Sequence, residues 1–294
     1  MKKMKRYFLI ICLFPVLIYA QKTQDVEVDL FLSEAMLKDI SIKTTLINSI
    51  DYTSNGFLLL SSSNQFYILG IGYLEELFKP TKKKIESYTV TPEGKLYIVS
   101  GKDLCKIDTL GNFKKIYSLQ NVNMGIASGN SGIYLFDQSI QKNKRDYSLF
   151  SLNKNLGRTK LVTMNTPIKS VYEYNANVFF TAKNKLYCTN KQMESFVEIL
   201  TLPQESDAII SIVGDSEHHA FYISTDKTIY RMKDNNIEII SEDFGGILKY
   251  DGEGLLIFDP KKSSIIRLRN NILYPSIVQR KENLPSLEIG RAHV

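Results

Sequence analysis

The sequence contains no tryptophan, only three histidines and only three cysteines among its 294 residues. One histidine, His293, lies in the last six residues, which leaves His218 and His219 as neighbours. The chain therefore offers few histidines that could act as the base for a serine or cysteine nucleophile. A metal bound by both imidazoles is also disfavoured, because adjacent side chains on a strand or turn point apart. We interpret both histidines as exposed turn residues.

Several sequence motifs that indicate catalysis or metal binding are missing as well. We find no glycine-rich phosphate loop, no paired CxxC, no HExxH and no EF-hand loop. The absence of tryptophan weakens the case for a site that stacks on sugars, although 17 tyrosines and 15 phenylalanines are present. Alternation of tyrosine along the apolar segments favours core packing for most of them.

The first twenty residues have the order of a secretory signal peptide. Four cations precede an apolar run from Tyr7 to Tyr19, and the small residue Ala20 follows. The run is too short for a comfortable membrane span, so we predict a signal peptide over residues 1–20, with an uncleaved anchor as the alternative. No later run is apolar enough to cross a bilayer. We therefore expect a protein exported to the periplasm, the cell surface or the exterior.

The charge balance changes once both ends are set aside. Residues 289–294 resemble the translation of a sequencing adapter, and we interpret them as an artefact outside the fold. The chain has 37 Lys and Arg against 31 Asp and Glu. Four cations lie in the predicted signal peptide and Arg291 is a fifth, while neither end contains an acid, so 32 cations face 31 acids. A nearly neutral chain gives no support for a nucleic-acid partner.

An internal repeat dominates the remainder of the sequence. Six turn positions are each followed by an apolar run: Gly56, Gly94, Gly132, Asn177, His219 and Gly254. They stand 38, 38, 45, 42 and 35 residues apart. An apolar residue lies six positions before each of them: Ile50, Tyr88, Ile126, Val171, Val213 and Leu248. Each unit holds four short runs rich in Ile, Val, Leu, Tyr and Phe, separated by turn residues.

Four strands that recur with a period near 40 residues are typical of a β-propeller blade. One blade cannot bury both of its faces, but blades packed around an axis can. We predict an all-β fold, a six-bladed propeller of four-stranded antiparallel blades over residues 45–278. Residues 279–288 form a C-terminal segment. Cys105 and Cys188 fall on third strands of different blades, so we predict two buried thiols rather than a disulfide.

A closed ring needs its ends fastened. Within the N-terminal segment 21–44, the strand-like run VEVDLFLS at 26–33 is predicted to supply the outer strand of the last blade and so to cover its edge. The run ILYPSIV at 272–278 is the rival for that place, and both would be used if a seventh blade existed.

The repeat also resembles a known group of proteins. Gly94-Lys95-Leu96-Tyr97-Ile98-Val99 and Thr228-Ile229-Tyr230-Arg231-Met232 are similar to the recurring pattern of six-bladed propellers of the NHL-repeat, TolB-like and gluconolactonase-like group. The resemblance covers residues 45–278 and implies the architecture, not an activity.

That resemblance implies one candidate metal site. Gluconolactonase-like propellers hold a divalent cation near the axis with Glu, Asn and Asp, and the loops that enter the innermost strands carry such residues here: Asn48, Glu86, Asn121, Asn123, Asp207 and Asp243. Glu86, Asn123 and Asp207 match the residue types, and hard oxygen ligands suit calcium or magnesium. Polar residues at the mouth of a water-filled channel are the alternative interpretation.

A second set of loops, between strands two and three, lies on the same face and carries cations. These are Lys102, Lys142, Lys144, Arg145, Lys183, Lys185, Lys227, Lys261 and Lys262, in five of the six blades. They predict a positive rim that meets an anionic protein or envelope component. The alternative is that lysine merely protects and solubilises each hairpin. The longest such loop, DQSIQKNKRD in blade three, is predicted to reach furthest toward a partner.

The sequence therefore favours an exported, monomeric binding module without a cofactor, which meets its partner at the lysine-bearing face. The second interpretation is a hydrolase or lactonase that depends on calcium or magnesium at Glu86, Asn123 and Asp207. A propeller that processes polysaccharide is the third, and it would need several acids and aromatics at one point.

Overall fold

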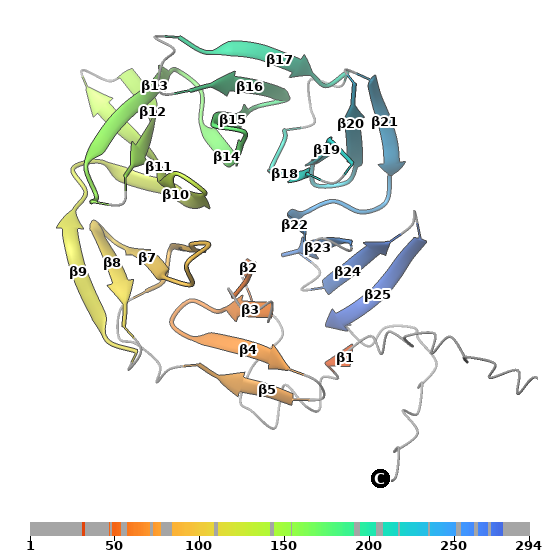
Figure 1. Ribbon diagram of the computed structural model, residues 1–294, viewed down its shortest axis with the longest axis horizontal. Helices are drawn as coiled ribbons and strands as arrows, with labels where there is room; N and C mark the ends of the chain where they lie inside the picture. Colours follow the sequence, from red (N-terminus) through yellow and green to blue (C-terminus); the bar gives the residue numbers. More distant parts are fainter. Residues whose placement is uncertain are drawn as a thin grey trace, which may run out of the picture.

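The computed structural model describes the following parts of the chain: 31–32, 47, 49–53, 58–70, 73–77, 84–108, 111–141, 144–153, 155–190, 195–203, 208–216, 218–234, 236–250, 254–261, 264–269 and 272–278. These residues form β-strands and no helix. Accordingly, the described part of the chain holds no helix long and apolar enough to cross a membrane. Figure 1 shows six sheets arranged around a common axis, so the prediction of a six-bladed β-propeller is confirmed.

Each blade is a sheet of antiparallel strands in chain order, from the axis outward. Blades one to three consist of β2 (Ser49–Tyr52), β3 (Leu58–Ser61), β4 (Phe66–Gly70), β5 (Tyr73–Glu76), β6 (Ser87–Val90), β7 (Leu96–Ser100), β8 (Asp103–Ile107), β9 (Phe113–Ser118), β10 (Val122–Gly129), β11 (Gly132–Gln141), β12 (Lys144–Leu152) and β13 (Arg158–Met164). Blades four to six consist of β14 (Ile168–Tyr174), β15 (Asn177–Ala182), β16 (Lys185–Thr189), β17 (Val197–Thr201), β18 (Ser211–Asp215), β19 (Ala220–Ser224), β20 (Ile229–Lys233), β21 (Asn236–Ser241), β22 (Ile247–Tyr250), β23 (Leu255–Asp259), β24 (Ser264–Arg269) and β25 (Ile272–Val278).

The core lies between neighbouring blades rather than within one sheet. The six apolar residues that precede the repeat turns all lie buried on the innermost strands: Ile50, Tyr88, Ile126, Val171, Val213 and Leu248. Five of them, Tyr88, Ile126, Val171, Val213 and Leu248, pack in clusters that join two neighbouring blades, and the Tyr88 ring meets that of Phe66 with centroids 5.0 Å apart. Both faces of a blade are thereby removed from water, which explains why the unit repeats.

Hydroxyl groups on the inner strands tie neighbouring blades together. Ser128 Oγ of blade three donates to Val90 O of blade two at 2.6 Å, and Leu248 N of blade six donates to Ser211 Oγ of blade five at 3.0 Å. A short polar side chain on the innermost strand thus satisfies backbone groups that would otherwise be buried without a partner.

A second recurring contact fixes the face that carries the predicted cations. The connection that leads from one blade to the next donates a backbone hydrogen bond to the hairpin between strands two and three. These bonds run from Ile85 N to Ser63 O (2.6 Å), from Leu119 N to Lys102 O (2.6 Å) and from Ile209 N to Lys183 O (2.7 Å). The hairpins and the inner-strand entries therefore share one face, as the alternation of strand directions requires.

Both segments considered for the outer strand contribute to blade six, the segment 26–33 through Phe31 and Leu32, its only described residues. β25 completes that blade as its fourth antiparallel strand, and β1 (Phe31–Leu32) adds a fifth strand that pairs with β25 in parallel. Blades six and one meet beside the axis, where Lys249 Nζ lies 2.9 Å from Asp51 Oδ1.

Blade three departs from the expected loop. The residues of DQSIQKNKRD do not form an open loop, because Ser139, Ile140 and Gln141 pair with Asp146, Arg145 and Lys144 as continuations of β11 and β12. The two strands reach 10 and 9 residues. The prediction of a long loop was therefore wrong in form, because the ladder continues as far as Gln141 and Lys144.

The two described cysteines lie on third strands of different blades, as the repeat predicts. Cys105 on β8 and Cys188 on β16 are both buried and neither forms a disulfide, so the prediction of two buried thiols is confirmed. Burial raises the pKa of the Cys188 thiol.

Candidate functional site

Two of the three residues matched to a metal site lie at the same end of the inner strands. Glu86 is exposed and directly precedes β6, and Asn123 is the second residue of β10 in the next blade. Ser87 Oγ, adjacent to Glu86, donates to Asn123 Oδ1 at 3.0 Å, which joins the two strands at this point. The third residue, Asp207, lies outside the described residues.

The Asn123 amide is already engaged within the protein. Its Nδ2 donates to Gly125 O at 3.1 Å, across a bulge in the ladder, while its oxygen accepts from Ser87. The amide oxygen keeps a second lone pair, so Glu86 and Asn123 together offer the hard oxygen donors that calcium and magnesium prefer. In the part of the chain that the structure describes, no group of three or more His, Cys, Asp or Glu gathers to hold a metal.

The other polar residues of these entry loops divide in role. Asn121 Nδ2 donates to Asp137 Oδ2 at 3.1 Å, and Arg158 Nη2 lies 2.8 Å from the same oxygen. Asn121 therefore belongs to a network around a buried carboxylate. Asp243 is exposed in the connection before β22, and Asn48 lies outside the described residues.

The predicted cations lie at the hairpins between strands two and three. Lys102, Lys183, Lys227 and Lys261 stand in the turns, and Lys144, Arg145 and Lys185 begin third strands. Lys142 and Lys262 lie outside the described residues. Together, the described members form what we call the lysine rim.

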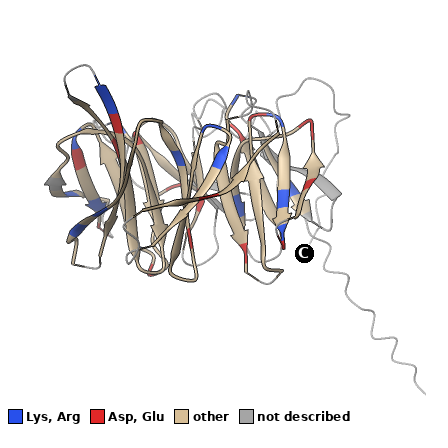
Figure 2. Ribbon diagram, turned by 90° about the horizontal axis from the view of Figure 1, so that it is seen from above, with Lys and Arg blue, Asp and Glu red and all other residues tan. Residues whose placement is uncertain are grey.

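Neighbouring acids neutralise part of the lysine rim. The ion pairs are Lys144–Asp146 (3.5 Å), Lys185–Glu198 (2.7 Å) and Lys261–Asp226 (2.8 Å). The hydrogen bond between Lys185 and Glu198 raises the pKa of the ammonium and lowers that of the carboxyl. Figure 2 accordingly shows Lys and Arg interspersed with Asp and Glu around the ring.

Four cations of the rim form no ion pair with any residue that the structure describes. They are Lys102, Arg145, Lys183 and Lys227, one in each of blades two to five, and all four are exposed. The rim thus keeps one cation without an ion pair in each of four consecutive blades, on a face that also carries the exposed acids Glu86 and Asp243.

The two neighbouring histidines find different partners. His218 Nδ1 lies 2.8 Å from Asp215 Oδ2, and His219 Nδ1 lies 3.1 Å from the Tyr174 hydroxyl. Both side chains are exposed in the turn between β18 and β19. The interpretation of both histidines as exposed turn residues agrees with this geometry.

Comparison with known proteins identifies the fold. No family model matches the chain, and no curated protein matches it in sequence. Several solved structures, however, are similar to it in fold. The extracellular domain of a hybrid two-component system from B. thetaiotaomicron aligns with a TM-score of 0.61 and 12% identity over 88% of this chain. The protein is a β-propeller. This chain spans only 36% of the length of that bacterial protein.

Two further structures show the same architecture in different contexts. A chain from a nidogen–laminin complex aligns with a TM-score of 0.61 and 11% identity, over 72% of this propeller and 89% of that chain. A gluconolactonase from Xanthomonas campestris aligns with a TM-score of 0.59 and 8% identity, over 71% of this propeller and 81% of that chain. At such identities the likeness establishes the fold alone.

Proposed function

We propose that this propeller is a non-catalytic binding module that meets an anionic partner at the lysine rim. The observation that carries the proposal is the set of four exposed cations without an ion-pair partner among the described residues, one in each of blades two to five. On a chain whose remaining charge is balanced, such a set attracts a negative surface and orients it.

We also infer that the module works outside the cytoplasm. Residues 1–20 support this by their order of cations, apolar run and small residue, although they lie outside the described residues. Further support comes from a structural neighbour that is itself an extracellular domain.

Charge reversal on opposite faces of the same two blades tests the proposal. Lys102→Glu with Lys227→Glu changes the rim in blades two and five. Lys95→Glu with Lys233→Glu makes the same change in charge at exposed positions on the opposite face of those blades. Binding to immobilised poly-glutamate is measured against salt for wild type and both variants.

We expect the rim variant to bind about tenfold more weakly, which corresponds to about 1.4 kcal/mol. The control variant should stay close to wild type. Equal losses in both variants would mean that only net charge matters, and the proposal would then be withdrawn.

A metal-dependent hydrolase is the second candidate, because Glu86 and Asn123 lie at one end of neighbouring inner strands. If a divalent cation binds there, it would polarise a carbonyl or activate water. Glu86, Asn123 and Asp207 would be its protein ligands.

Thermal unfolding with calcium, magnesium or a chelator distinguishes this candidate. A ligand at a hundred times its dissociation constant adds about 2.7 kcal/mol of stability, a shift of several degrees. Under the hydrolase candidate, Glu86→Ala abolishes that shift, whereas Glu93→Ala, at the opposite end of the same blade, preserves it. The same melting temperature with and without metal would rule the metal site out.

A further inference from the structure

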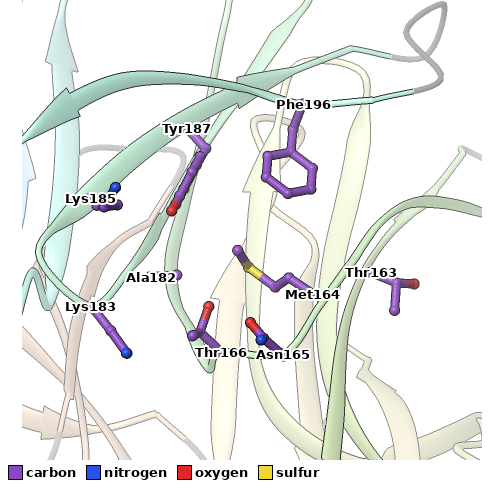
Figure 3. A pocket seen from close by; sticks show the side chains of 9 residues that line it. All are labelled: Thr163, Met164, Asn165, Thr166, Ala182, Lys183, Lys185, Tyr187 and Phe196. Carbon is purple, nitrogen blue, oxygen red and sulfur yellow. The ribbon is translucent and has the colours of Figure 1, made fainter.

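A pocket opens on the side of the ring between blades three and four. Its volume is about 470 Å³. That volume falls within the range of sites that hold small organic ligands, about 300–1,000 Å³. As Figure 3 shows, Phe196, Tyr187 and Met164 form one part of the lining, and Lys183, Thr166 and Asn165 lie together toward the other end.

The apolar part of the pocket is a rigid aromatic wall. The Tyr187 and Phe196 rings meet edge to face with centroids 5.3 Å apart. Both rest on Phe180, which is completely buried, at 5.3 Å and 5.6 Å. A wall supported by the core between two blades is formed before any ligand arrives, so little ordering is required on binding.

The polar end of the pocket is held by an unusual turn. Lys183 adopts φ 52°, a left-handed conformation that disfavours residues with a side chain. The corresponding hairpin of blade two has Gly101 at φ 59°. Lys183 O accepts from Ile209 N at 2.7 Å, and the buried Asn184 amide donates to Leu202 O at 3.0 Å.

Charge at this end is unequal between the two lysines of the pocket. Lys185 is neutralised by Glu198 at 2.7 Å, whereas Lys183 forms no ion pair with a residue that the structure describes. One ammonium is therefore left beside the Thr166 hydroxyl and the Asn165 amide, which together provide the donors that an anionic group requires.

The long hairpin of blade three extends the same surface. Ile140 on β11 pairs with Arg145 on β12. Gln138, two residues before Ile140, pairs with Tyr147, and Tyr147 pairs on its other side with Met164 of β13. Paired residues share a face of the sheet, and alternate residues along a strand share it too, so all five lie on the face toward blade four. Ile140 is 62% exposed, and Figure 2 shows this hairpin rising above the ring at the left.

We propose that this pocket binds a small amphiphilic organic anion. Its apolar body lies against Met164, Tyr187 and Phe196, and its acidic group is held by Lys183. The inference rests on the proposed function, because it names the ligand class and the site at which the lysine-bearing face would capture an anion.

The test is a fluorescence titration of the full chain with 8-anilinonaphthalene-1-sulfonate, an aromatic sulfonate that becomes fluorescent in apolar surroundings. Lys183→Gly removes the ammonium at a position whose backbone suits glycine, so the melting temperature should not fall. Lys233→Ala removes an exposed cation on the opposite face of blade five, outside the lysine rim, and is the control. We expect about tenfold weaker dye binding for Lys183→Gly and wild-type binding for Lys233→Ala.

Three results overturn the inference: no dye binding by wild type, wild-type affinity in Lys183→Gly, or equal losses in both variants. None of these results would refute the proposed function, which is tested separately at Lys102 and Lys227 in the poly-glutamate experiment. Conversely, poly-glutamate binding that survives rim reversal removes the proposed function independently of the dye.

Discussion

The network around Asp137 predicts an asymmetry between two substitutions that remove the same ion pair. Asp137 has a side chain only 2% exposed, and Arg158, its partner at 2.8 Å, is 27% exposed. Asn121 also donates to Oδ2, whereas Oδ1 has no hydrogen-bond partner among the described residues. The Arg158 guanidinium lies 3.5 Å above the Phe150 ring. Arg158→Ala and Asp137→Ala therefore leave very different groups behind.

Arg158→Ala leaves a carboxylate in the interior with one amide donor. Removal of one partner from a buried pair costs about 3–5 kcal/mol. Asp137→Ala leaves an arginine that keeps its aromatic contact and reaches water, so the cost is that of a charged hydrogen bond, about 1.5–3 kcal/mol. In the double variant no buried charge remains. Addition of Asp137→Ala to Arg158→Ala should therefore restore stability rather than reduce it further.

Urea unfolding at neutral pH measures all three variants against wild type. A constant slope with denaturant shows that only the free energy of unfolding has changed. Arg145→Ala, an exposed arginine of the same blade, is the control and should stay within about 0.5 kcal/mol. Two results would refute this reasoning: Arg158→Ala costs no more than Asp137→Ala, or the double variant is less stable than both single variants. Either would mean that Arg158 does not compensate the free-energy cost of burying the Asp137 carboxylate.

Two further outcomes follow from the packing. A methyl group added in Gly125→Ala would overlap the Phe136 ring, so the ring must move, and we expect a loss of about 1–3 kcal/mol in thermal unfolding. An unchanged melting temperature would show that the ring moves without cost. Cys105 and Cys188 are buried, and burial raises the pKa of Cys188, so neither thiol should react with a disulfide reagent at pH 8 until urea unfolds the protein. Rapid reaction at Cys105 or Cys188 of the folded protein, located by peptide mapping, would contradict that burial.

The fold was accessible from the sequence because its signal is repeated six times. Leu248 and Ile50 stand at the two ends of the repeat, yet each precedes its turn by the same interval and each is buried on an inner strand. Local apolar patterning is sufficient to predict such a ring, because every blade packs against its neighbours in the same way. The positions of Cys105 and Cys188 followed from the same register.

The site was less accessible, because it depends on pairs that the repeat does not encode. Glu198 neutralises Lys185 from the next strand, and Asp226 neutralises Lys261 from a different blade. Cross-strand pairing would have predicted the first of these, but not the second. The extended hairpin at Ile140 was hidden by its polar composition, and the pocket at Lys183 arises only where two blades meet.

The parallel pairing of β1 with β25 has a consequence for the order in which the ring is completed. Phe31 and Leu32 pair with Ile277 and Val278, so strands from near the two ends of the described chain lie side by side. Contacts between residues so distant in sequence carry the largest loop-closure entropy and form late. During synthesis, β1 has no partner until blade six has emerged, and we therefore expect it to join that blade late in folding.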